Sequence, residues 1–143
     1  MKRGFTLIEL LVVISIIALL SSVVMSSLNV ARAKGRYTSA TSQMRQLKLA
    51  AESYYSAIGS YPLDTSIGTM PSGLSTYISA WPTPPCSNYV YDWNNVSNLG
   101  TNINVDMRTI SPSASVYTYC IYSSTGSCGG VDIMTVASKQ LSC

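Results

Sequence analysis

The chain has 143 residues, which is enough for one domain, but its composition is unusual for a water-soluble protein. Charged residues make up 10% of it, against about 25% in an average soluble domain, and hydrophobic residues make up 47%. The net charge is only +3 and histidine is absent, so we expect no nucleic-acid surface, no enzyme, no cofactor and no metal site.

The first predicted element is a long apolar segment near the N-terminus. From Leu10 to Ala31 no side chain is charged, and as a helix these 22 residues would span about 33 Å, enough to cross a bilayer core. A secretory signal peptide would explain the basic start and the small residues around Ala31–Ala33. However, the apolar run is longer than such signals need, and Glu9 lies near its start. A carboxylate inside an apolar segment is costly and requires a partner.

A simple membrane anchor is the second interpretation of this segment. The basic pair that precedes it favours a cytoplasmic N-terminus, whereas the basic residues that follow it (Arg32, Lys34 and Arg36) argue for the opposite orientation. The rest of the chain is rich in Ser and Thr and carries the cysteines, which suits an external location, so we expect a single pass with the head outside. An anchor alone explains neither the presence of Glu9 in the apolar segment nor the Gly4–Phe5 sequence directly before it.

The stretch from Gly4 to Ile14, GFTLIELLVVI, explains both because it resembles the prepilin motif of type IV pilins and type II secretion pseudopilins. The resemblance implies that a membrane peptidase cuts between Gly4 and Phe5 and then N-methylates Phe5. It also implies that Glu9 is the assembly carboxylate, paired with the new terminal amine of a neighbouring subunit. Removal of the leader would also remove Lys2 and Arg3, the charges that hold the N-terminus in the cytoplasm.

The same resemblance implies a structural subunit of a type IV pilus or a type II secretion pseudopilus. Its partners would be other pilin subunits in a homo-oligomeric filament, the prepilin peptidase, and the inner membrane with its assembly machinery. The precursor would lie in the cytoplasmic (inner) membrane, and the assembled subunit in a cell-surface or periplasmic filament. The choice between a pilus, a competence filament and a pseudopilus stays open, as does that between a major and a minor subunit.

One helix is predicted from Phe5 to Ile58, because no proline occurs before Pro62. Its second half carries an apolar stripe at alternating steps of three and four residues, and Gly59 is placed to end the helix. The stripe consists of Tyr37, Ala40, Met44, Leu47, Ala51, Tyr54 and Ile58. We therefore divide the chain into a leader (1–4), a transmembrane and assembly helix (5–31), an amphipathic helix (32–58) and a globular head (59–143).

The predicted fold is α+β, with the long helix packed against a small antiparallel sheet in the head. Strands are expected at Tyr89–Trp93, Val116–Ser123 and Val131–Val136, and one short helix near 72–79. Turns are expected at 94–95, 98–100 and 124–126.

Four cysteines, Cys86, Cys120, Cys128 and Cys143, all lie in the C-terminal half and are disulfide candidates. Two disulfides among them allow three connectivities, of which we favour Cys128–Cys143 together with Cys86–Cys120.

The alternative function is a membrane-tethered surface binding module, an adhesin of the minor-pilin kind. Six aromatic residues of the head would form its binding face: Tyr89, Tyr91, Trp93, Tyr117, Tyr119 and Tyr122. The competing interpretation, which we favour, is that these side chains pack the sheet against the helix.

Overall fold

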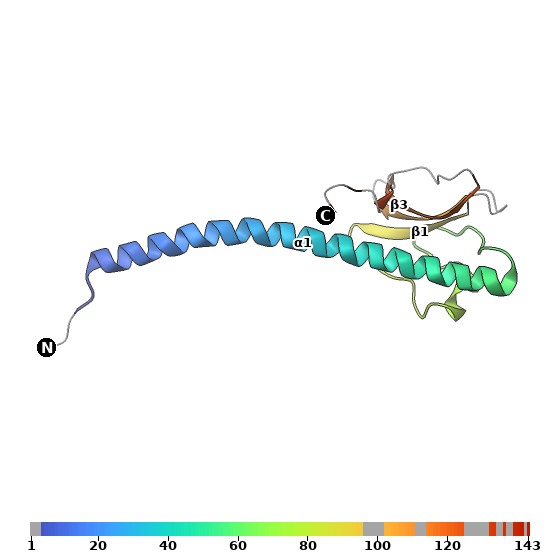
Figure 1. The fold of residues 1–143 in the computed structure, drawn as a ribbon, viewed down its shortest axis with the longest axis horizontal. Helices are drawn as coiled ribbons and strands as arrows, with labels where there is room; N and C mark the ends of the chain where they lie inside the picture. The colour runs from blue at the N-terminus through green and yellow to red at the C-terminus, as the bar shows by residue number, and fades with distance from the viewer. Residues whose placement is uncertain are drawn as a thin grey trace.

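The computed structural model describes residues 4–95, 102–110, 114–124, 132–133, 136, 139–141 and 143. It is an α+β structure with a long helix, α1 (Leu7–Ile58), and a three-stranded sheet packed on one side of its C-terminal half. The N-terminal half of α1 extends beyond the head without packing against any of the described residues (Figure 1). The predicted fold class is confirmed.

Helix α1 is continuous, as predicted, and begins two residues later than expected, after the N-cap Thr6. Its serines are accommodated because their hydroxyls donate hydrogen bonds back to carbonyls one turn earlier, as Ser15 does to Leu11 and Ser21 to Ile17. Such bonds bend helices slightly, and α1 curves gently in Figure 1. Gly59 ends the helix with a φ of 82°, a conformation that favours glycine, so the predicted C-cap is also confirmed.

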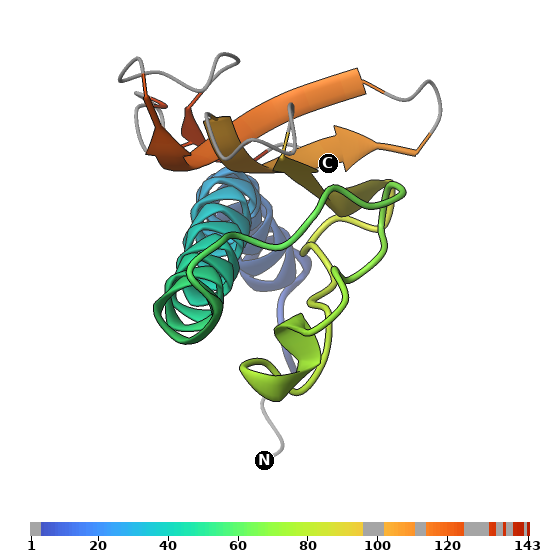
Figure 2. The ribbon, with the colours of Figure 1, turned by 90° about the vertical axis from the view of Figure 1, so that its right-hand side faces the viewer.

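The sheet has the order β1-β2-β3, with β1 (Tyr89–Asn95), β2 (Asn102–Thr109) and β3 (Ala114–Ser123) all antiparallel. Figure 2 looks along α1 and shows the sheet covering one side of the helix, with the loop that contains η1 (Leu74–Thr76) on another side. Strand β2 was not predicted, although its apolar and polar residues alternate as in a half-buried strand.

Several predictions for the head were wrong or only partly correct. Residues 94 and 95 form the end of β1 rather than a turn, because both pair with β2. The short helix near 72–79 is limited to the three residues of η1. Among the described residues of the third expected strand (132, 133 and 136), only Asp132 pairs, in an isolated parallel bridge with Thr118. The expected turn at 98–100 lies outside the described residues.

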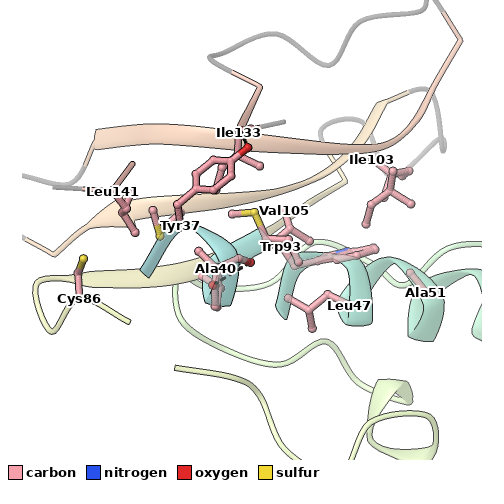
Figure 3. Close-up of a cluster of buried hydrophobic side chains, with 14 residues drawn as sticks. Tyr37, Ala40, Leu47, Ala51, Cys86, Trp93, Ile103, Val105, Ile133 and Leu141 are labelled. Atoms are coloured by element: carbon pink, nitrogen blue, oxygen red, sulfur yellow. Dashed lines mark hydrogen bonds between the residues drawn. The ribbon is translucent and has the colours of Figure 1, made fainter. Parts of the chain in front are cut away.

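The core forms where the apolar stripe of α1 meets the inner face of the sheet (Figure 3). The stripe is buried from Tyr37 to Ala51, as predicted, but Ile58 is 61% exposed because the helix continues past the sheet. Trp93 is fully buried against this stripe, and its indole N–H donates to the carbonyl of Pro62 at 3.1 Å. The Tyr37 hydroxyl donates to the carbonyl of Ile133 at 2.9 Å, which ties α1 to the C-terminal tail.

The tail is fixed to the helix and to the head by separate contacts. The backbone N–H of Leu141 donates to the carbonyl of Ala33 at 3.0 Å, and the Leu141 side chain is fully buried. Cys143 forms a disulfide with Cys86, just before β1. The pairings that we favoured from the sequence are therefore wrong. Leu141 contacts Ala33 at the end of the head nearest the N-terminal half of α1, where Cys86 also lies, so Cys143 meets Cys86 (Figure 3). Cys120 is disulfide-bonded too, and Cys128 lies outside the described residues.

Candidate functional site

The bond between Gly4 and Phe5 lies in an exposed, non-helical segment just before α1. The Phe5 side chain is 83% exposed, so the chain itself does not shield this bond. A Cβ added at Gly4 would meet no other atom within 4 Å, which means that packing does not require glycine at this position. The glycine is instead explained if another protein must approach the backbone closely here.

Glu9 closes a capping box with Thr6 at the start of α1. The Thr6 backbone N–H and the Thr6 hydroxyl both donate to Oε2 of Glu9, at 2.8 and 2.7 Å. In return, the Glu9 backbone N–H donates to the Thr6 hydroxyl at 3.3 Å. This arrangement satisfies helix N–H groups that would otherwise have no partner, and it places the carboxylate near the positive end of the helix dipole. Glu9 is therefore partly stabilised within a single chain.

The capping box was missed in the sequence, although its signal is present. A Thr followed three residues later by a Glu, directly before an apolar run, is a known mark of a helix N-terminus. The predicted partner of Glu9 was the terminal amine of another chain, whereas its partner in the structure is Thr6 of its own chain.

The exposed Glu9 carboxylate shares one face of α1 with apolar side chains. Phe5, Ile8, Glu9, Val12 and Val13 surround a shallow hollow of about 390 Å³ on the helix surface. The helical positions among them, 8, 9, 12 and 13, are one, three and four residues apart and so fall on one face of α1, and Phe5 lies just before its start. The second carboxylate oxygen, Oε1, accepts no hydrogen bond from any described residue. A partner that fits this face has to supply apolar surface together with a positive charge.

The apolar surface continues along the whole N-terminal half of α1. The helix is long and apolar enough to cross a membrane, with a mean hydropathy of 2.8 in its most apolar window, and none of that window is buried within the chain. Large apolar residues from Leu7 to Met25 are about half exposed or more. A continuous surface of this size requires lipid or other protein chains to cover it.

The six aromatic residues considered for a binding face mostly belong to the core. Tyr91 and Trp93 are fully buried, and Tyr89, Tyr117 and Tyr119 pack against the core cluster, as our favoured interpretation predicted. Tyr122 is the exception, because it is 45% exposed beside Tyr61, with ring centroids 6.0 Å apart. The prediction that these six residues together form a binding face is therefore wrong.

Polar groups gather on the outer face of the sheet, remote from Glu9. Asp92 and Asp106 lie directly opposite each other on β1 and β2, and both are buried. Arg108 donates to Asp92 at 2.7 Å, while Asp106 accepts hydrogen bonds from two asparagine side chains. Burial raises the pKa of the Asp92 carboxyl, Arg108 opposes this, and Asp106 adds to the increase. Among the described residues, no cluster of three or more potential ligands is arranged to hold a metal ion.

The N-terminal part of the chain matches a known family model. Residues 1–25 match the prokaryotic N-terminal methylation motif, which is the signature of type IV pilins and pseudopilins. Neither a curated protein nor a solved structure matches the chain. The match covers the Gly4–Phe5 bond and Glu9, and it indicates prepilin-type processing and a structural rather than a catalytic protein.

Proposed function

We propose that the chain is the structural subunit of a filament, either a type IV pilus or a type II secretion pseudopilus. The observation that carries this proposal is the exposed apolar face of α1 with Glu9 at its start, directly after an accessible Gly4–Phe5 bond. The matched motif supports prepilin peptidase as the processing partner and a membrane-anchored precursor. In this proposal residues 1–4 are the leader, 5–31 the membrane and assembly helix, 32–58 the amphipathic helix and 59–143 the head.

Processing would create the charge that Glu9 needs. Hydrolysis of the Gly4–Phe5 bond leaves a carboxylate on Gly4, which departs with the leader, and a protonated α-amine on Phe5. Methylation of that amine leaves it basic and therefore still positively charged. The amine of one subunit can then pair with the Glu9 carboxylate of its neighbour, whose Oε1 accepts no hydrogen bond from the described residues of its own chain. Such a pair would offset part of the cost of placing a carboxylate among apolar helices and would fix the axial register.

The assembly role is tested with Glu9→Gln, which removes the charge and keeps the size of the side chain. We expect the variant to be processed and inserted normally but to be absent from sheared filaments, as measured by immunoblot of the filament fraction. Glu52→Gln is the matched control, because Glu52 lies on the same helix but forms only an exposed pair with Lys48 at 3.5 Å. Normal filament yield from Glu9→Gln would remove the carboxylate from the assembly mechanism.

A further inference from the structure

Three basic side chains follow the apolar segment of α1 within two turns. Arg32, Lys34 and Arg36 form no ion pair with any described residue, and no acidic residue lies on α1 between Glu9 and Glu52. Arg32 and Arg36 are four residues apart on one helix face, a spacing at which like charges repel. The described residues therefore concentrate positive charge here without an ion pair among them to neutralise it.

This charge lies at a defined depth if α1 spans a membrane, as the proposed function requires. The uncharged segment ends at Ala31 after about 33 Å of helix, close to the thickness of a bilayer core. The next residues then lie at the level of the lipid headgroups, and arginine and lysine side chains reach phosphates from such positions. Arg32, Lys34 and Arg36 are also the residues that argue against a cytoplasmic N-terminus, because basic residues are usually found on the cytoplasmic side of a membrane helix.

A pocket is built around two of the three cations. Three elements line a cavity of about 530 Å³: the helix with Asn29, Arg32, Ala33 and Arg36, strand β3 with Tyr117, and the tail with Gln140, Leu141 and Cys143. Lys34 does not line it.

The wall that the tail supplies is held in place. The backbone of Leu141 is hydrogen-bonded to Ala33, and the disulfide to Cys86 fixes Cys143, which also lines the pocket. The position of the tail beside the helix at this cavity is thus set by a backbone hydrogen bond and a covalent bond.

We propose that this pocket binds the headgroup of an anionic phospholipid in the leaflet that faces the head. Two arginines can clamp the phosphate through paired N–H donors, which a lysine ammonium cannot do in the same geometry. The amides of Asn29 and Gln140 offer further donors and acceptors for the polar part of the headgroup. A bound anion would also relieve the repulsion between Arg32 and Arg36.

The test measures which lipid stays bound to the full-length protein. Protein in detergent micelles is mixed with equal amounts of phosphatidylglycerol and phosphatidylcholine, and retained lipids are counted by native mass spectrometry. We expect wild type to prefer phosphatidylglycerol. The double variant Arg32→Gln/Arg36→Gln should lower that preference about 25-fold, since each basic residue near an anionic surface contributes about fivefold. Lys34→Gln is the matched control and should change the preference less than either arginine variant does, because Lys34 does not line the pocket.

Three results would overturn the proposal. Wild type with no preference between the two lipids would exclude a headgroup site. An effect of Lys34→Gln as large as that of each arginine would indicate general surface charge rather than a pocket. Complete displacement of the lipid by excess inorganic phosphate would show that the cavity recognises the free anion alone. The Cys86–Cys143 linkage and the melting temperature of each variant check that the head is folded, and prepilin processing of the variants is scored separately.

Discussion

At the scale of single residues, we propose two successive roles for Glu9, one within its own chain and one in the filament. Before assembly its Oε2 accepts hydrogen bonds from the backbone and the hydroxyl of Thr6, so a monomeric precursor can carry the carboxylate at moderate cost. In the proposed filament the neighbour's amine approaches an oxygen that has no partner among the described residues. Thr6 thus holds the carboxylate in one orientation before the second chain arrives.

Asp92 leads to a prediction about pH. Its pKa is raised by burial, so the folded head binds this proton more tightly than the unfolded chain does. The Asp92 contribution to stability is therefore complete below the unfolded pKa and is lost as the pH rises through the folded pKa. Compared with Asp92→Asn, wild type should gain melting temperature as the pH falls from about 7 towards about 4, in melts of the sheet followed by circular dichroism. A constant difference between the two proteins over this range would contradict the prediction.

The residue scale also shows what a sequence can and cannot supply. Glu9, Gly4 and Gly59 are readable because their effects are local: a charge in an apolar run, a glycine at a cleavage motif, a glycine that ends a helix. The disulfide partner of Cys86 depends on where the tail returns, and no local pattern encodes that. The favoured Cys128–Cys143 pairing would have joined the last expected strand to the tail, whereas the Leu141–Ala33 contact holds the tail against α1.

At the scale of elements, the two halves of α1 have different surroundings. Its second half is anchored by the stripe that packs under the sheet, while its first half keeps its apolar surface exposed. The stripe was predictable from its spacing, whereas the exposure of Ile58 was not, because it depends on where the sheet ends. The alternation of apolar and polar residues in NINVDMRT could have predicted strand β2. The strand was missed because this segment is short and lies between two turn signals.

Because one face of the second half of α1 is buried and the other exposed, the same substitution should lower the free energy of unfolding by different amounts at neighbouring positions. Leu47 is fully buried and Leu49 is 63% exposed on the same helix. Leu47→Ala should lower the free energy of unfolding by about 2–5 kcal/mol, because it removes packed methyl groups and leaves a cavity. Leu49→Ala should change it by less than about 0.5 kcal/mol. Denaturant unfolding of the full chain in micelles, followed by the fluorescence of Trp81 and Trp93, measures both. Equal losses would mean that the helix face against the sheet is assigned wrongly.

At the scale of the whole molecule, three features meet along one helix: a cleavable start, an uncovered apolar surface and a head fixed to the far half (Figure 1). The disulfide and the Leu141 contact place the end of the tail beside the basic residues that follow the apolar segment. In the proposed filament the exposed apolar half of α1 would be covered first by lipid and then by other subunits. The head would remain on the outside.

The tail predicts a stability effect that belongs to this scale. Cys86 and Cys143 are 57 residues apart in sequence, so their bond removes considerable freedom from the unfolded chain. Cys143→Ser should lower the stability of the head by about 2–4 kcal/mol, measured by thermal melting without reductant. Peptide mapping under non-reducing conditions should recover a linked Cys86–Cys143 peptide from wild type. Recovery of Cys143 linked to any other cysteine would contradict the fold of the tail.

The most direct test of the central claim is the N-terminal residue of the protein after it has been made in cells with a prepilin peptidase. The account predicts a mature chain that starts at Phe5 and carries one methyl group on its α-amine, as read by N-terminal sequencing and intact mass. Gly4→Val should block this step without altering the fold, since a side chain at Gly4 meets no other atom, and Gly35→Val serves as the control away from the cleavage site. A mature chain that starts at Met1, or at Lys34 after cleavage as a secretory signal, would contradict the account.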